Sequence, residues 1–507
     1  LLAKLQGQLG AEQGSRAWED VMLADDPEAP TTTTRRFPYP PLTGGRVVGS
    51  VVIDPGSIES SDPRASTATV SAVAAPPRRR ASNWLLVAPE RSATGNSVAV
   101  MGPQLGYFYP EIVQQIHLNG PGIQAQGAAV PGPAMYILIG RTENYAWSLT
   151  SAGHDVRDVY VEPFCEPDGS PPTRASNHYL FRGKCRVFET VDAGRLNGQP
   201  ISFRTSVHGG VIGSCTVGGV PHALSRKRST QGRDGLNLAA LKDMTEGKAK
   251  TPRRFFKVAN QFGFTFNWAY VSRTGTAFFS SGLLPRRPRG LDRRLPTLGT
   301  GKFEWRGYLP ALKHPHDETG PGGLLLNWNN RSAPGFMHGD DEPYGSAQRV
   351  ELFDGYPAAV TLEQDVSVMN RAATEDVRSP VWPIVSRVLA SSGPAPDPRD
   401  AHVVAILDEW VTRDAPRLDA DLDGAYDDAG PTILDALWGR LARAVMSPVF
   451  GSLVADLDAV RGLDGQSGHS YVDKDLRTLL GDPVTGPFHL RYCGSGSLAD
   501  CRASLWT

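Results

Sequence analysis

Short apolar runs separated by glycine and proline turns fill the chain after residue 82, and they limit the fold more than any other feature. The runs predict strands at 97–101, 112–118, 135–139, 146–150 and 156–162. Helical periodicity is clear only at 432–446, where one apolar face contains Ile433, Leu434, Leu437, Trp438, Leu441 and Val445. We therefore expect a sheet-rich core with helix packed against it.

The first 81 residues have a different character. Residues 1–26 read as helix, which the prolines at 27 and 30 and the threonines at 31–34 end. Residues 35–81 are rich in Pro, Ser, Ala and Arg and predict a flexible spacer that buries little. Its arginines at 78–80 are more typical of a solvated linker than of a nucleic-acid site. Since Leu1 already lies in a helical pattern, we expect the sequence to start within a longer product.

Charge and hydropathy narrow the choice of partners. Lysine and arginine total 52 against 53 acidic residues, so no overall field favours nucleic acid or an anionic membrane. No apolar run approaches the roughly 20 residues that a bilayer crossing needs. We expect neither nucleic acid nor a membrane as a partner.

The five cysteines include no CxxC pair, which argues against a zinc or thioredoxin-like site. Cys165 with Cys185, and Cys493 with Cys501, could close short loops as disulfides and leave Cys215 free. The alternative is a set of five buried thiols in a cytosolic protein.

The segment with the most chemical content is Ala81-Ser82-Asn83-Trp84-Leu85-Leu86-Val87, followed by Met101-Gly102-Pro103-Gln104. A serine that becomes a chain start can be nucleophile and base at once. Its α-amine has an ordinary pKa of about 7.7 to 8.0, so near neutral pH a useful fraction can accept the hydroxyl proton. Cleavage before Ser82 would therefore supply both functions in one residue.

This segment, with its preceding basic spacer and the following Tyr107-Phe108-Tyr109, resembles the start of the catalytic chain of the penicillin acylase family. Members are N-terminal nucleophile hydrolases whose precursors cut themselves before the serine. The resemblance implies an α+β fold, a four-layer αββα sandwich. It also implies that 1–34 end the small chain, that 35–81 form a spacer and that 82–507 form the catalytic large chain.

The same resemblance assigns the catalytic residues. Ser82 is the nucleophile and base, and Gln104 helps to hold the serine end. The segment Leu326-Asn327-Trp328-Asn329-Asn330 resembles the family's Trp-Asn-Asn motif, which makes Asn329 the oxyanion donor, with Asn327 as the alternative.

Two further catalytic positions follow from motif context. Trp147-Ser148-Leu149-Thr150 resembles the family's Trp-x-x-Thr strand, so the backbone N–H of Ser151 is the expected second oxyanion donor. Arg349 matches the arginine that orders the site.

Two acidic groups suggest calcium. Asp155, Asp158 and Asp340 resemble the family's calcium ligands, although a further glutamate would lie before Leu1. Separately, Asp419, Asp421 and Asp423 precede Gly424 as in the front of a calcium loop. The twelfth position is Gly430 and not glutamate, so the alternative is a solvated acidic loop. We expect structural Ca²⁺ and no organic cofactor.

The register of the nucleophile is the main departure from the family. Many members have tryptophan fourth in the catalytic chain, whereas Trp84 is third after cleavage before Ser82. The alternative register places Ala81 at the nucleophile position and predicts an inactive protein. We favour Ser82, because that register also places Gln104 without a gap.

We therefore expect an amidohydrolase that cleaves a linear amide, such as a penicillin-like or N-acyl substrate, through an acyl-enzyme. The alternatives are an acyl-homoserine lactone or lipopeptide acylase, and a non-catalytic binding relative. The family and the possible disulfides favour a secreted or periplasmic protein.

Overall fold

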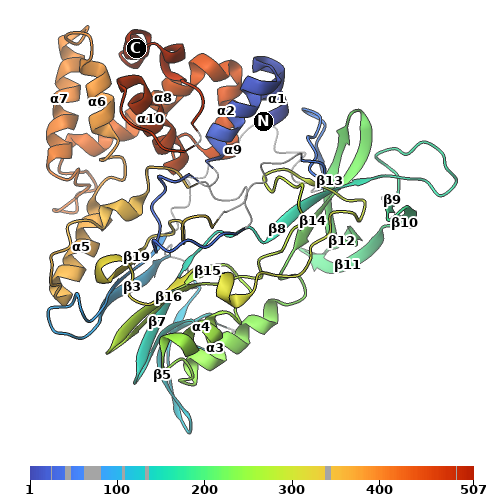
Figure 1. The fold of residues 1–507 in the computed structure, drawn as a ribbon, viewed down its shortest axis with the longest axis horizontal. Coiled ribbons are helices and arrows are strands. Elements are labelled where there is room, and N and C mark those ends of the chain that lie inside the picture. Colours follow the sequence, from blue (N-terminus) through green and yellow to red (C-terminus); the bar gives the residue numbers. More distant parts are fainter. Residues whose placement is uncertain are drawn as a thin grey trace.

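The computed structural model describes residues 1–23, 26–39, 47–61, 81–105, 109–131, 136–336, 344–486 and 488–507. Its centre is a pair of sheets (Figure 1). The smaller sheet has the order β19 (Leu324–Asn327), β2 (Ala81–Val87), β3 (Val98–Gln104). The larger has the order β18 (His316–Asp317), β16 (Gly275–Ser280), β15 (Phe266–Ser272), β7 (Tyr145–Ser151), β6 (Ile139–Thr142), β5 (Ile123–Ala129), β4 (Gln114–Gly120).

The two sheets pack face to face through apolar side chains. Trp84 and Leu86 of β2 lie against Ala269 and Phe278 of the larger sheet, and all four are buried. Burial of this kind stabilises by about 25 cal/mol per Å² of apolar surface. Successive strand residues alternate between faces, so Leu85 points the other way and packs with Val368 of α5 (Leu362–Thr374).

Helices cover both outer faces. The α5 helix starts at Thr361, whose side chain accepts from the Gln364 N–H while Gln364 bonds back, a capping box. On the other side, α3 (Asn237–Thr245) and α4 (Pro252–Ala259) share a core with the larger sheet. The order helix, sheet, sheet, helix confirms the predicted αββα sandwich.

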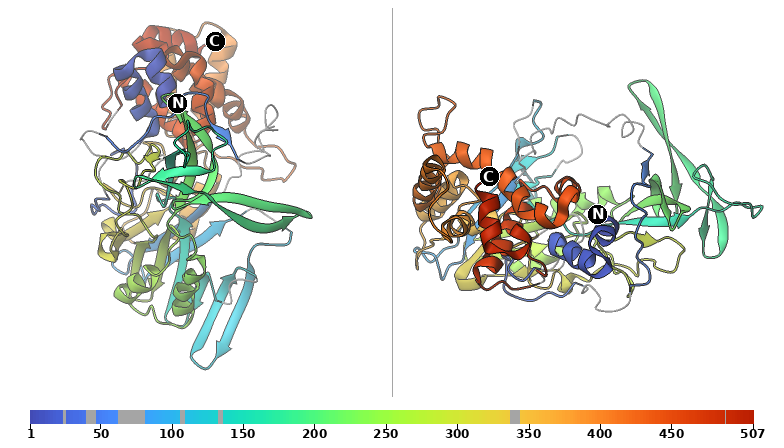
Figure 2. Two further views of the ribbon diagram at one scale, coloured as in Figure 1. Left: turned by 90° about the vertical axis from the view of Figure 1, so that its right-hand side faces the viewer. Right: turned by 90° about the horizontal axis from the view of Figure 1, so that it is seen from above.

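A third sheet adjoins the two sheets of the sandwich (Figure 1). Its order is β11 (Glu189–Leu196), β12 (Gln199–Ser206), β13 (Gly209–Val217), β14 (Val220–Arg228), β8 (Arg157–Pro163), β17 (Thr297–Leu298), and β1 (Glu59–Ser60) pairs with β13. The small pair β9 (His178–Phe181) and β10 (Lys184–Val187) lies beside it. Figure 2 shows strands of this region projecting from the body.

Helices from both ends of the chain form one further core. They are α1 (Leu2–Leu9), α2 (Ala11–Met22), α6 (Trp382–Ala390), α7 (Pro398–Thr412), α8 (Ala429–Phe450), α9 (Val454–Arg461), α10 (Gln466–Leu480) and α11 (Leu498–Leu505). Figures 1 and 2 both show α1 and α2, in blue, beside the red C-terminal helices.

The sequence located these helices only in part. The predicted helix at 432–446 lies within α8. The predicted helix at 1–26 is two helices, because Gly10 adopts φ 83°, a left-handed conformation that interrupts the helix and that glycine tolerates. Four predicted strands overlap β3, β4, β7 and β8, whereas the described part of 135–139, which begins at Tyr136, meets β6 at Ile139.

Part of the predicted spacer is packed. Tyr39 is 1% exposed and donates through its hydroxyl to the Pro285 carbonyl at 2.8 Å. Val51 is buried, and β1 belongs to the third sheet, where it pairs with β13. The prediction that this segment buries little is therefore wrong for these residues, whose apolar side chains found partners that composition does not reveal. Residues 62–80, with the arginine triplet, lie outside the described residues.

The cysteine prediction is confirmed: Cys165 bonds Cys185, Cys493 bonds Cys501, and Cys215 is a buried free thiol. Among the described residues, no helix is long and apolar enough to cross a membrane.

Candidate active site

Ser82 lies near the start of β2, at one end of the small sheet. In the ladder with β3, Ser82 pairs with Pro103 and Ala81 pairs with Gln104. The predicted Gln104 therefore lies next to the serine end, on the neighbouring strand. The Ser82 backbone N–H donates to Oδ1 of Asn329 at 3.2 Å, which joins the expected nucleophile to the asparagine motif.

The asparagine motif follows the end of β19. Asn327, the last residue of that strand, is fully buried, whereas Asn329 lines the cavity beside Ser82. Asn329 has φ 60°, a left-handed conformation that asparagine tolerates better than most residues. Its Nδ2 donates to the Ser151 carbonyl at 2.9 Å. The two expected oxyanion positions are therefore adjacent, and Asn329, in contrast to the buried Asn327, lines the cavity.

Arg349 fixes the orientation of the Asn329 amide. It belongs to η4 (Arg349–Leu352), where Gln348 and Glu351 form a capping box. Arg349 donates through Nε to the Trp328 carbonyl at 3.1 Å and through Nη2 to Asn329 Oδ1. Because Oδ1 accepts from both Arg349 and the Ser82 N–H, the donor Nδ2 faces Ser151.

One cavity of about 700 Å³ brings the predicted catalytic residues together. All five of them line it: Ser82, Gln104, Ser151, Asn329 and Arg349. Leu105, Phe264 and Phe266 supply apolar wall, while Arg157 and Arg228 add polar groups. A cavity with both kinds of wall suits a ligand that carries an apolar group and a polar amide.

Sequence reasoning missed several residues that support this cavity. Tyr344 lines it and donates its hydroxyl to the Ala152 carbonyl at 3.1 Å. Behind the wall, Asn267 Oδ1 accepts from the hydroxyls of Ser280 at 2.7 Å and Ser332 at 2.8 Å, and Ser280 also contacts His154. These partners are far apart in the chain and carry no local motif, so the sequence holds no signal for them.

The first predicted calcium site contains a guanidinium. Nε of Arg287 donates to both carboxylate oxygens of Asp158, at 3.0 and 2.9 Å, and Nη2 to Asp155 Oδ1 at 2.7 Å. The Arg287 side chain is 2% exposed, and the two carboxylates raise its pKa further although burial acts in the opposite direction. In this arrangement the carboxylate oxygens of Asp155 and Asp158 do not fit a calcium site, because the Arg287 guanidinium already binds them. Asp340 lies outside the described residues.

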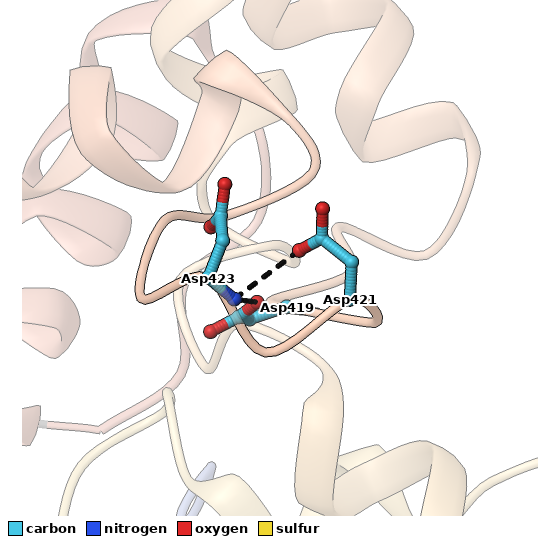
Figure 3. A group of neighbouring side chains, drawn as sticks. All are labelled: Asp419, Asp421 and Asp423. Carbon is cyan, nitrogen blue, oxygen red and sulfur yellow. Dashed lines mark hydrogen bonds between the residues drawn. The ribbon is translucent and has the colours of Figure 1, made fainter.

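The second acidic group does converge. Asp419, Asp421 and Asp423 each bring a carboxylate oxygen within 4.8 Å of the others, the one such group found in the part of the chain that the structure describes (Figure 3). The loop is closed by backbone N–H donors: that of Asp423 donates to Asp419 at 3.1 Å, and that of Gly424 at 3.0 Å. Gly424 has φ 92°, the sharp turn that the sequence predicts here.

The sequence model of the penicillin amidase family matches residues 2–487. The chain belongs to this family. A solved structure of the thermostable penicillin G acylase from Alcaligenes faecalis has the same fold, with a TM-score of 0.68 and 24% identity over 83% of this chain and 77% of that one.

Curated relatives carry more than one name. The chain is 26% identical to penicillin G acylase of Escherichia coli over 73% of its own length and 43% of the relative's. It is 25% identical to the acyl-homoserine lactone acylase QuiP of Pseudomonas syringae pv. tomato, over 59% of this chain and 34% of that protein. Penicillin acylase 2 proenzyme of a Pseudomonas sp. is 26% identical over 53% of the chain and 34% of its own length. The chain thus spans less than half the length of these relatives.

Proposed function

We propose that the protein is an amide-cleaving acylase that works through Ser82 after self-cleavage between Ala81 and Ser82. The observation that carries the proposal is the grouping of Ser82, Gln104, Ser151, Asn329 and Arg349 around one cavity. Membership of the penicillin amidase family supports it, as do relatives named penicillin acylase and proenzyme.

Cleavage frees the amine that the reaction needs. In the uncut chain the Ser82 nitrogen is an amide and cannot accept a proton. Once freed, the amine takes the hydroxyl proton through one water molecule, while Oγ attacks the substrate carbonyl carbon.

The tetrahedral intermediate then places its oxyanion near Asn329 and the Ser151 backbone. Nδ2 of Asn329 and the N–H of Ser151 donate to it, each worth about 3 to 4 kcal/mol in the transition state. Collapse breaks the C–N bond, and the departing amine takes the proton that the Ser82 amine holds. A water molecule next attacks the acyl-enzyme, which releases the acid and restores Ser82.

The test is intact mass analysis of the purified product. We expect a large chain that begins at Ser82, and Ser82→Ala should remain uncut and inactive. Ser82→Ala that still cuts, or a wild-type chain that never cuts, contradicts the mechanism. A protein that binds N-acyl ligands without cleaving itself or them would be the non-catalytic alternative.

The substrate proposal has two candidates. We favour a linear N-acyl compound with an apolar acyl group, because Leu105, Phe264 and Phe266 line the cavity. Similarity to QuiP makes acyl-homoserine lactones, or the related lipopeptides, the second candidate. Initial rates with a phenylacetyl amide and with C6 to C12 acyl chains on one chromogenic amine separate these candidates.

We also propose that much of the predicted spacer stays with the small chain after processing. Asp54 Oδ2 accepts from the Thr216 hydroxyl at 2.6 Å and the Gly219 N–H at 2.8 Å, and Ser50 Oγ donates to the Asp292 carbonyl at 3.0 Å. Cleavage before Ser82 leaves these bonds intact. We expect the mature small chain to include residue 61, and its measured mass tests this. The two disulfides support a location outside the cytosol.

A further inference from the structure

Residues 31–39, which we call the strap, run alongside residues 331–336, directly after the asparagine motif. Thr31 pairs in parallel with Arg331, and Tyr39 with Phe336. The Thr32 N–H donates to the Arg331 carbonyl at 3.0 Å, and the Tyr39 N–H to the Gly335 carbonyl at 3.0 Å. The strap lies before the proposed cleavage point, so it would belong to the small chain.

Thr32 binds the two asparagines that flank the expected oxyanion donor. Its side chain is buried with only 3% of the residue exposed. Its Oγ1 accepts from Nδ2 of Asn327 at 2.8 Å and from Nδ2 of Asn330 at 3.4 Å. Thr32 therefore lies behind the motif and does not line the cavity.

Asn327 links Thr32 to Asn329 through hydrogen bonds at both ends of its side-chain amide. Its Oδ1 accepts from the Asn329 N–H at 3.0 Å and from the Thr150 hydroxyl at 2.5 Å. An amide side chain has one accepting and one donating end. Because Thr32 satisfies the donating end, the accepting end stays directed at the left-handed backbone of Asn329 and at the end of β7.

Asn330 holds the same turn from the other side. Its Oδ1 accepts from the Trp328 N–H at 3.0 Å, and its Nδ2 donates to the Pro30 carbonyl at 3.3 Å as well as to Thr32. Residues on both sides of Asn329 are thus tied to residues 30–32.

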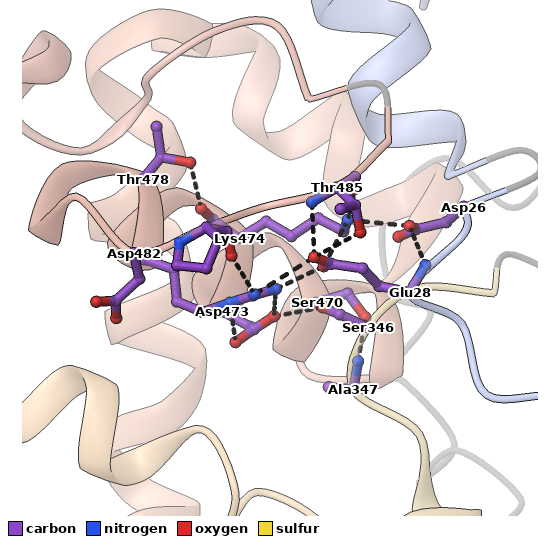
Figure 4. A network of polar contacts seen from close by, with 12 residues as sticks. Asp26, Glu28, Ser346, Ala347, Ser470, Asp473, Lys474, Thr478, Asp482 and Thr485 are labelled. Atoms are coloured by element: carbon purple, nitrogen blue, oxygen red, sulfur yellow. Dashed lines mark hydrogen bonds and ion pairs between the residues drawn. The ribbon is translucent and has the colours of Figure 1, made fainter.

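The segment just before the strap is fixed to α10 (Figure 4). Lys474, 1% exposed at its side chain, donates to Asp26 Oδ1 at 2.9 Å. Glu28 pairs with Lys474 at 2.9 Å and with Arg477 at 2.5 Å, and these bonds lower its pKa to about 2 although burial alone would raise it. The strap thus has a defined entry point on the large chain.

We propose that Thr32 is a positioning residue for catalysis: the small chain's hydroxyl holds Asn327 and Asn330, and through them sets the Asn329 amide at the oxyanion position. The proposal rests on the proposed function. Its consequence is that the oxyanion site is completed by a second polypeptide after cleavage, so the small chain does more than cover the large one.

The test compares three substitutions in the full chain. Thr32→Val keeps the shape and removes the hydroxyl, Thr32→Ser keeps the hydroxyl, and Thr34→Val is an exposed control on the same strap. Turnover of a phenylacetyl amide is measured per cleaved molecule. We expect Thr32→Val to lower kcat about tenfold with KM unchanged, since a buried donor loses its acceptor. The kcat of Thr32→Ser should stay within about twofold of the wild-type value, and the kcat of Thr34→Val should equal the wild-type value.

Several results would overturn the proposal. One is wild-type kcat in Thr32→Val, and another is an equal loss in Thr32→Ser. A loss explained by a lower fraction of folded protein, measured by thermal unfolding, counts equally against it. If wild type itself neither cuts nor turns over, the proposed function fails instead. A crystal structure of Thr32→Val on the Ser82→Ala background then still decides the positioning role, because an unmoved Asn329 side chain contradicts it.

Discussion

Two groups of aspartates for which the sequence suggests calcium lie in opposite environments. Asp155 and Asp158 are 1% and 8% exposed, and both bind Arg287. Asp419, Asp421 and Asp423 lie at the surface and accept only backbone N–H groups among the bonds the structure shows for them. The family resemblance suggested calcium for Asp155 and Asp158, and the spacing before Gly424 suggested it for the surface loop. The difference teaches that the cation which neutralises buried carboxylates can come from a distant arginine, which no local pattern reveals.

Removal of Arg287 should have the largest effect. Arg287→Met removes the guanidinium that binds both buried carboxylates, although Arg293 stays 3.7 Å from Asp155, and should lower the free energy of unfolding by about 3 to 5 kcal/mol. Denaturant unfolding on the Ser82→Ala background, which we expect to keep every variant as one chain, measures this. Arg286→Met, a neighbouring arginine with an exposed side chain, is the matched control.

The same variant sharpens the comparison between arginine and metal. We expect that Ca²⁺ does not restore the stability of Arg287→Met, because the carboxylate oxygens of Asp155 and Asp158 are arranged around a guanidinium. Equal stability of Arg287→Met and Arg286→Met would remove the argument that the buried pair needs Arg287. Restoration by Ca²⁺ would show instead that a metal can take its place.

Glu162, another buried carboxylate on β8, pairs with a histidine, whose charge depends on pH. His208 contacts Glu162 at 2.6 Å and Glu304 at 2.7 Å, and stacks on Tyr160 at 3.9 Å between ring centroids. Burial alone would lower the pKa of His208, but the bonds to Glu162 and Glu304 outweigh burial and raise it. A protonated imidazole here acts as Arg287 does for Asp158, with the difference that pH can remove its charge.

Because the folded pKa of His208 is raised, its contribution is fully present below the unfolded value of about 6.5 and is lost as pH rises through the folded value. At pH 6, His208→Gln should cost about 2 kcal/mol, the scale of hydrogen bonds to charged groups. Unfolding measured from pH 6 to 9 should show the gap between wild type and His208→Gln narrowing. A gap that stays constant with pH would mean that the imidazole binds as a neutral group.

The sequence predicted those features whose signal lies in a short stretch of the chain, and missed those that depend on residues far apart in it. The Ser82 segment, the Trp-Asn-Asn motif and Arg349 are short motifs, and the structure places them at one cavity. The packing of Tyr39 and Val51 depends on partners more than 200 residues away in the chain, such as Pro285 and Pro296, so composition misassigned them. Thr32 is similar: a threonine run reads as a helix stop, and its role needs Asn327 beside it.

The surface aspartates should respond to calcium, with the smallest effect of the three. We propose that Asp419, Asp421 and Asp423 bind one Ca²⁺ ion, supported by their convergence within 4.8 Å. At a free concentration ten times the Kd, binding should add about 1.4 kcal/mol to stability. A calcium titration followed by thermal unfolding, with Mg²⁺ in parallel, measures the gain.

Asp421→Asn is the matched variant for this loop. In the absence of calcium it should change stability by no more than about 0.5 kcal/mol, because the side chain is exposed. In calcium it should abolish the gain, since one hard oxygen ligand has lost its charge. A gain that survives in Asp421→Asn would move the calcium site elsewhere in the chain. No gain in wild type would make the loop a solvated acidic turn, and the contrast with Asp155 and Asp158 would then concern burial alone.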